Sequence, residues 1–262
     1  MKAVLVALLL AAAAIAQTPV IASGGVLNGA SFAKGQGVAP GSLVSIFGSA
    51  LAGGLTQNDT VPLSTKLSDV SVTFNDIPAG LYFVSPGQIN AQIPWDVMPA
   101  GTTQGQIKMV VTRNGTASQP QQVDFLPVAP GIFYLADAGG WAIAINADGS
   151  LAAPVNAIPG IATHPAAAGD GLALLATGLG AVDSPLVNGA ASLDKLRNAV
   201  VTPGVLVGGK SAAVLFAGLS PQFPGVNQVN FTIPSGVTAG TVPLQLQVSG
   251  ITTTNQVLIA TR

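Results

Sequence analysis

A seven-residue stretch, residues 88–94, reads Gln-Ile-Asn-Ala-Gln-Ile-Pro, and residues 228–234 read Gln-Val-Asn-Phe-Thr-Ile-Pro. Five of the seven positions agree if Ile and Val are counted as equivalent. Both copies alternate polar and apolar residues, which is the period of a half-buried strand. Both end in Pro, which has no N–H for a ladder and so tends to end a strand. The sequence therefore predicts one structural unit used twice.

Short strand patterns and turn signals recur on either side of both copies. The stretch from Val70 to Phe74 alternates cleanly, and Asn114-Gly115 is a strong hairpin signal because both residues tolerate a positive φ. The chain holds 32 Gly and 19 Pro, as expected for many short strands with few helices. Each half has about seven such strands, with turns every 8–12 residues. The predicted fold class is all-β, with two tandem immunoglobulin-like antiparallel β-sandwiches.

The chain starts with Met1-Lys2 and an apolar run over 3–16 that ends in a small-x-small site, Ala14-Ile15-Ala16. These features predict a secretory signal peptide, and the apolar run is too short to span a bilayer. The mature chain is expected to be secreted, in the periplasm or outside the cell, with no membrane span. The predicted organisation is a signal peptide at 1–16, an extended lead-in at 17–36, domain 1 at 37–134, a junction with a small hairpin at 135–167, and domain 2 at 168–262.

The composition restricts the possible chemistry. Charged residues make up 7% of the chain, the net charge is −1, and there is no basic cluster, so nucleic acid is not an expected partner. The absence of Cys excludes disulfides, thiol nucleophiles and thiolate metal sites. All ten acidic residues are Asp, and His164 is the only imidazole.

Three stretches carry a resemblance to known sequences. They are Val38 to Gly48, Tyr82 to Trp95, and Leu215 to Pro221. In this order they resemble the uncharacterised C-terminal domain found in many secreted Solibacter and other acidobacterial proteins, over roughly residues 28–262. The Pro-Gly-x-x-Val-x-Ile-x-Gly opening is also similar to the IPT/TIG branch of immunoglobulin-like folds. The resemblance implies an exported β-sandwich protein, and it implies no catalytic or binding residues.

The candidate catalytic and metal groups are weak. A hydrolytic triad would need His164 as its base, but His164 lies in a Pro- and Ala-rich tract and no Gly-x-Ser-x-Gly elbow is present. The Asp residues mostly fall at turns, where a carboxylate caps its own backbone. The stretch from Asn146 to Ser150 has one Asp and no following Glu, so a hairpin turn is favoured over a calcium loop. We therefore predict no catalytic residues, no metal site and no cofactor.

The polar face of the repeated strand is the remaining candidate site. Its amides could bind sugar hydroxyls beside a stacking aromatic ring. The residues of this candidate ligand site are Gln88, Asn90, Gln92, Trp95 and Asn230. The competing interpretation is structural, because such amides commonly satisfy loose backbone groups beside long connections. The residues assigned structural roles are Asn90, Asn230, Pro94, Pro234, Gly48 and Gly178.

These observations predict a non-enzymatic binding, adhesion or structural module at the bacterial cell surface or in the periplasm. Its possible partners are a cell-surface protein or a polysaccharide. A carbohydrate-binding module that uses the polar strand face is the first alternative. An exported hydrolase is the second.

Overall fold

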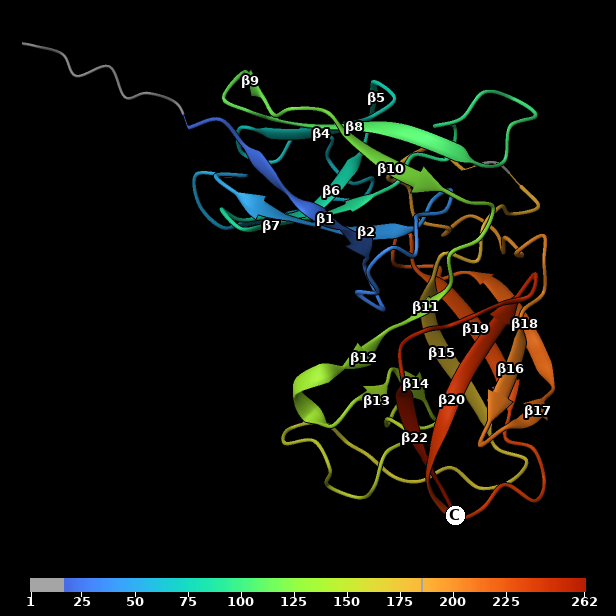
Figure 1. Ribbon diagram of the computed structural model, residues 1–262. Coiled ribbons are helices and arrows are strands. Elements are labelled where there is room, and N and C mark those ends of the chain that lie inside the picture. Colours follow the sequence, from blue (N-terminus) through green and yellow to red (C-terminus); the bar gives the residue numbers. More distant parts are fainter. Residues whose placement is uncertain (1–16, 185) are drawn as a thin grey trace, which may run out of the picture.

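The computed structural model describes residues 17–184 and 186–262, and the predicted signal peptide lies outside this range. The described chain forms four sheets arranged as two pairs. Figure 1 shows one pair, built from β1 to β10, above the other pair, built from β11 to β22. We call these pairs the first unit and the second unit. The predicted all-β class with tandem immunoglobulin-like sandwiches is confirmed.

The first unit consists of two five-stranded sheets. One has the order β1 (Val20–Asn28), β2 (Leu43–Ser49), β7 (Gln88–Gln92), β6 (Gly80–Val84) and β3 (Thr56–Gln57). The other has the order β10 (Gln121–Phe125), β8 (Gly105–Arg113), β4 (Val70–Phe74) and β5 (Ile77–Pro78), with β9 (Thr116–Ala117) also paired to β8.

The second unit consists of a five-stranded and a seven-stranded sheet. The smaller has the order β11 (Gly131–Ile132), β15 (Gly171–Thr177), β19 (Asn227–Thr232) and β18 (Val214–Leu219), with β14 (Ala144–Ile145) also paired to β15. The larger has the order β12 (Tyr134–Leu135), β13 (Trp141–Ala142), β22 (Val257–Thr261), β20 (Gly240–Val248), β16 (Gly204–Val207) and β17 (Lys210–Ala212), with β21 (Ile251–Thr252) paired to β20.

The two copies of the repeated stretch occupy corresponding places in the two units. In β7, Asn90 pairs with Ser45 of β2 on one side and with Phe83 of β6 on the other. In β19, Asn230 pairs with Ala173 of β15 and with Phe216 of β18. The pairing of β7 with β6 has a register shift just before Phe83, and the pairing of β19 with β18 has one just before Phe216. The shared register and shared irregularity show that the sequence repeat is also a structural repeat.

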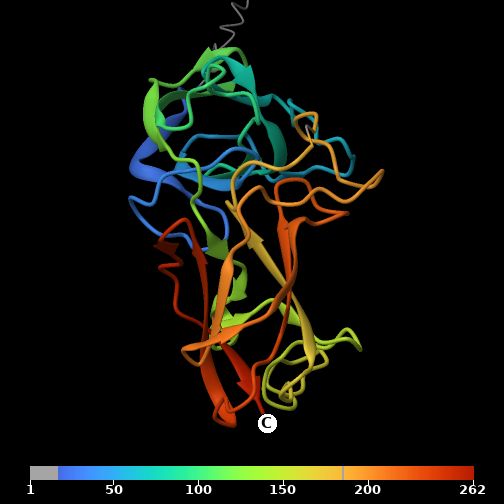
Figure 2. The same cartoon turned by 90° about the vertical axis from the view of Figure 1, so that its right-hand side faces the viewer.

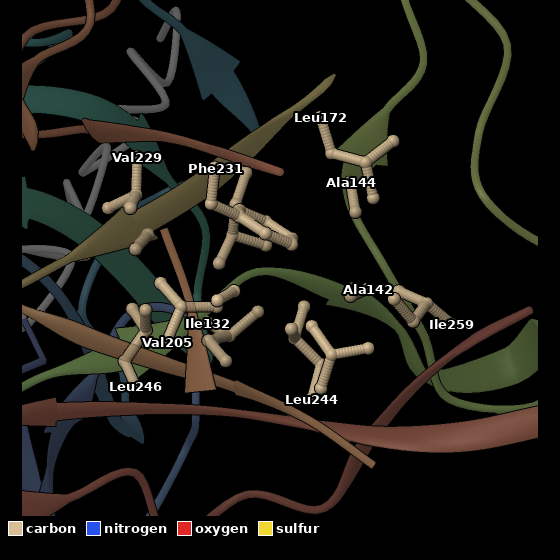
Figure 3. Close-up of a cluster of buried hydrophobic side chains, with 14 of the residues drawn as sticks. Ile132, Ala142, Ala144, Leu172, Val205, Val229, Phe231, Leu244, Leu246 and Ile259 are labelled. Carbon is tan, nitrogen blue, oxygen red and sulfur yellow. The ribbon is translucent and has the colours of Figure 1, made fainter. Parts of the chain in front are cut away.

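Alternation along each strand builds the cores, because successive side chains point to opposite faces of a sheet. In the second unit, Val229 and Phe231 of β19 face Leu244 and Leu246 of β20 across the sandwich, as Figure 3 shows. In the first unit a separate cluster of buried residues includes Ile89 and Ala91 of β7. Each unit therefore buries its own apolar interior.

The segment that the sequence predicts as a junction, 135–167, packs with the second unit. It supplies β13, which pairs with β22, and β14, which pairs with β15. A 3-10 turn, η1 (Ala136–Ala138), lies between β12 and β13. Trp141, Ile145 and Leu151 belong to a small apolar cluster beside the main core. The strands around residues 141–145 thus extend the sheets of the second unit.

The two units meet through an unusually long connection in the second unit. It runs from residue 178 to residue 203, between β15 and β16, and residue 185 within it is not described. Figure 2 shows this connection in orange, extending against the first unit. There the backbone N–H of Leu63 donates to the carbonyl oxygen of Gly189 at 2.8 Å. The end of β7 faces the same connection, since Gln92 and Trp95 bond to Gly189 and Asn188. We call this contact region between the two units the seam.

Candidate interdomain site

Gln92 at the end of β7 links the two units. Its side chain is 1% exposed. The Oε1 atom accepts a hydrogen bond from the backbone N–H of Gly189 at 2.7 Å, and Nε2 donates to the carbonyl oxygen of Gly41 at 3.3 Å. A buried amide with both ends paired contributes to stability, while leaving one partner unpaired is costly. Both polar atoms of the Gln92 amide are therefore engaged in hydrogen bonds and shielded from solvent.

Thr177 makes a second buried link at the end of β15. Its Oγ1 accepts from the backbone N–H of Leu43 at 2.9 Å and donates to the carbonyl oxygen of Gly225 at 2.7 Å. The Tyr82 hydroxyl donates to the carbonyl oxygen of Pro224 at 2.8 Å, and burial raises the pKa of Tyr82. These contacts join β2 and β6 of the first unit to the second unit.

Trp95 lies just beyond the end of β7, where the chain enters the seam. Its backbone N–H donates to Oδ1 of Asn188 at 2.8 Å, and Nδ2 of Asn188 donates to Oδ1 of Asp96 at 2.9 Å. The indole ring packs against Gly41, where an added Cβ would lie 2.2 Å from the ring. Gly41 also has a φ of +68°, so a side chain is excluded there on two grounds.

The other polar residues of the repeated strand pair with one another. Nε2 of Gln88 donates to Oδ1 of Asn90 at 2.8 Å, and Nε2 of Gln228 donates to Oδ1 of Asn230 at 2.9 Å. In the first unit Oδ1 of Asn90 also accepts from the buried hydroxyl of Ser45 at 3.0 Å. The Gln–Asn hydrogen bond is therefore formed within each unit, whereas Gln92 and Trp95 bond across the seam to the other unit.

The glycines and prolines with predicted structural roles lie near strand ends. A Cβ on Gly178 would lie 2.0 Å from the carbonyl oxygen of Ala129, and its φ is +82°. A Cβ on Gly48 would lie 2.1 Å from the carbonyl oxygen of Val20. Both positions therefore allow a close backbone approach. The two glycines are not equivalent in the repeat, because the strand register places Ala176 at the position of Gly48. Pro94 and Pro234 follow the ends of β7 and β19.

His164 forms a contact with Asp148 that the sequence did not predict. Its Nε2 lies 3.0 Å from Oδ2 of Asp148, and Nδ1 lies 3.0 Å from the carbonyl oxygen of Pro165. The contact with the Pro165 carbonyl and the nearby Asp148 carboxylate raise the pKa of His164. Asp148 also caps its own turn, because Oδ1 accepts from the N–H and the hydroxyl of Ser150. The hydrogen bonds from Ser150, and then His164, lower the pKa of Asp148.

Across residues 17–184 and 186–262, no group of three or more His, Cys, Asp or Glu side chains is placed to hold a metal ion. In the same residues, no helix combines the length and apolar character needed to cross a bilayer.

A pocket of about 670 Å³ opens at the seam beside Trp95. Four parts of the chain line it: Pro40 just before β2, the turn after β7, the end of β10 with the chain that leaves it, and the β15–β16 connection. The sequence indicated Trp95 but missed Asn188, Gly189 and Thr177. The unequal length of the connections in two otherwise equivalent units was the one signal that could have pointed to them.

Comparisons with known proteins support the fold of the first unit. Residues 33–125 match the IPT/TIG domain family. This range covers β2 to β10 and leaves out β1. No curated protein matches the chain. The described residues are therefore all-β, and the stretch from 33 to 125 is similar to IPT/TIG domains, which have an immunoglobulin-like fold.

Among solved structures, the chain is similar to SGBP-B of the Bacteroides ovatus mixed-linkage glucan utilization locus, in complex with a mixed-linkage heptasaccharide. The identity is 12%, the TM-score is 0.31, and the match covers 87% of this chain and 43% of that one. The full extracellular region of plexin A4 matches at 14% identity and a TM-score of 0.27, over 97% of this chain and 19% of that one.

The C-terminal domain of the Streptococcus agalactiae AgI/II polypeptide BspA matches at 12% identity and a TM-score of 0.22, over 93% of this chain and 100% of that one. The chain thus spans less than half the length of SGBP-B and about a fifth of the plexin region.

Proposed function

We propose that this protein is an exported, non-enzymatic binding or structural module in which two sandwiches act as one rigid body. The single observation that carries the proposal is the buried bonding of Gln92 across the seam. Because its amide accepts from a backbone group of the second unit, separating the units would leave the N–H of Gly189 without this partner. A rigid pair can hold a binding surface at a fixed distance and orientation from the rest of a surface assembly.

The distribution of titratable groups favours a non-enzymatic role. His164 and Asp148 lie close together, but each is tied to a local turn by hydrogen bonds to Pro165 and Ser150. A catalytic pair would be expected to face a cleft where substrate can reach both groups. Neither residue lines the pocket at the seam. We therefore assign this pair to the local structure of the second unit.

Other parts of the proposal rest on the sequence. The signal-peptide pattern at 1–16 supports export to the periplasm, the cell surface or the medium. The boundaries proposed from the sequence are 17–36 for the lead-in, 37–134 for domain 1, 135–167 for the junction and 168–262 for domain 2. The strand pairing differs from them at two places: β1 within the lead-in pairs in the first unit, and β11 to β14 pair in the second unit. The acidobacterial C-terminal family remains the proposed relative, and a surface protein or polysaccharide remains the proposed partner.

A carbohydrate-binding module is the alternative, because the partly buried Trp95 lines a pocket that also contains Asp96. The proposed sugar contacts of Gln88, Asn90 and Gln92 compete with the bonds these amides already make. Retention of the protein on insoluble polysaccharides tests this alternative. Retention that is lost in Trp95→Ala and kept in Leu193→Ala would support it, whereas no retention on any glycan would remove it.

Small-angle X-ray scattering tests the rigid pair. The scattering curve of the mature wild-type chain should match one fixed arrangement of the two units. The double variant Gln92→Leu and Thr177→Val should raise the maximum dimension and require several arrangements to fit the data. A wild-type curve that itself requires an ensemble of arrangements would contradict the proposal.

A further inference from the structure

We propose that the pocket at the seam binds a small ligand with an apolar body that is either uncharged or carries one positive charge. This inference rests on the proposed rigid pairing of the units, because residues of both units line the pocket. Its volume of about 670 Å³ lies within the range of about 300–1,000 Å³ that is usual for small-molecule sites. Such sites also occur preferentially where domains meet.

The walls of the pocket are mainly apolar. Trp95 and Met98 come from the turn after β7, Phe125 from the end of β10, and Leu186 and Val187 from the β15–β16 connection. Val187 is 74% exposed, so this apolar surface is open to solvent and available to a ligand. Removing that surface from water would favour binding of an apolar molecule.

Three prolines and one hydrogen bond across the seam restrict the backbone around the pocket. Pro40, Pro99 and Pro127 line it, and the proline ring fixes φ at each of these positions. At its rim the bond between Asn188 and Asp96 ties one unit to the other. A site that is ordered in advance loses less conformational entropy on binding.

Charge selects among apolar ligands. Asp96 is exposed, and among the described residues that line the pocket it is the only ionisable one. Its Oδ1 accepts a hydrogen bond from Nδ2 of Asn188, and the negative charge of a carboxylate attracts an incoming cation. With a lone carboxylate and no Lys, Arg or His in the lining, an anionic ligand such as a fatty-acid carboxylate would be repelled.

The polar content of the lining suits an apolar ligand better than the sugar of the alternative function. Asn188 uses its oxygen for the N–H of Trp95 and its nitrogen for Asp96. The other polar side chains of the lining are Thr102 and Thr103. A sugar offers a hydroxyl on most of its carbons, so it would bury several groups without partners in such a pocket.

Fluorescence titration of the mature protein with Nile red, a neutral apolar dye, tests the pocket. We expect saturable binding by the wild type and at least a tenfold loss of affinity in Ala181→Trp, which fills the lining at an exposed position. The matched control is Leu193→Ser, because Leu193 is 71% exposed on the same connection and does not line the pocket. This control should bind the dye within about twofold of wild type.

Competition by charged eight-carbon ligands tests the role of Asp96. Octyltrimethylammonium should displace the dye at lower concentration than octanoate, and Asp96→Asn should weaken the cation by about fivefold, the screened Coulomb effect expected at contact distance. Equal competition by both ligands in the wild type would overturn the charge selectivity.

Three outcomes overturn the site itself: absence of saturable dye binding, equal binding by Ala181→Trp and wild type, or self-association of the chain that Ala181→Trp abolishes. A wild type that scatters as a rigid pair but fails to bind the dye refutes this inference alone. A wild type that scatters as a flexible pair refutes the proposed function as well.

Discussion

The ends of β7 and β19 begin from the same sequence pattern and reach different environments. Gln92, the last residue of β7, is 1% exposed and bonds to the second unit. Thr232, the last residue of β19, is half-exposed. Upstream of both, the Gln–Asn side-chain pair is the same in the two units. The comparison shows that the repeated strand forms the same side-chain bond in both units. The contacts of its last residue depend on which segment packs against the strand end.

The core position two residues after Ile89 and Val229 gives the largest expected effect. In the second unit it is Phe231, which is fully buried, and in the first unit it is Ala91, which is also fully buried. Phe231→Ala should lower the free energy of unfolding by about 3–5 kcal/mol, because it leaves a cavity between the two sheets. Urea denaturation checks this value. A loss below about 1 kcal/mol would mean that the two cores are packed differently from the arrangement in Figure 3.

Gln92→Ala should have the next largest effect. It leaves the N–H of Gly189 buried without its acceptor, at a cost of about 1–3 kcal/mol. The matched control is Thr232→Ala at the equivalent position, where a change of about 0.5 kcal/mol or less is expected. Calorimetry should also show that Gln92→Ala separates the unfolding of the two units. Equal effects of the two variants would remove the distinction between the two strand ends.

The paired asparagines give a smaller effect that tests the internal similarity of the units. Asn90→Ala removes an acceptor shared by Gln88 and the buried hydroxyl of Ser45, and should cost about 1 kcal/mol. Asn230→Ala removes the bond from Gln228 alone, because Ala173 stands where Ser45 does, and should cost about 0.5 kcal/mol. Chemical denaturation of both variants measures the order. A larger loss for Asn230→Ala would contradict it.

The His164–Asp148 pair gives the smallest effect and concerns the second unit alone. Since the pKa of His164 is raised above 6.5, its contribution is present below pH 6.5 and lost as the pH rises through the folded value. Since the pKa of Asp148 is lowered below 3.8, its contribution is present above pH 3.8 and lost as the pH falls through the folded value.

Thermal melts of wild type and His164→Ala between about pH 3 and pH 8 check in which direction the stabilising effect of the pair changes with pH. The difference in melting temperature should be greatest between about pH 4 and pH 6 and should shrink above about pH 7. The positive charge of Arg262 acts on His164 in the opposite direction, so Arg262→Gln should widen the difference. A difference that grows with pH would show that the pair acts through packing and not through charge.

Much of the fold could be predicted because alternation and turns are local properties. The repeated stretch, its strand character and its end at Pro94 and Pro234 are readable from residue types alone. Less of the candidate site could be predicted from the sequence. Gln92 and Trp95 were indicated as polar and aromatic groups. Asn188 and Gly189 lie more than 90 residues away along the chain, and no residue pattern marks them as partners of Trp95 and Gln92.

The sequence by itself determined an all-β chain with a duplicated strand unit, since side-chain period, Pro and Gly act over a few residues. Only the tertiary structure decided that one copy of the repeat ends inside the seam between the two units, that Gln92 bonds to Gly189 there, and that an apolar pocket opens beside Trp95. The physical reason is that the partner of a strand end is set by how whole sheets and a long connection pack, and no local pattern encodes that packing.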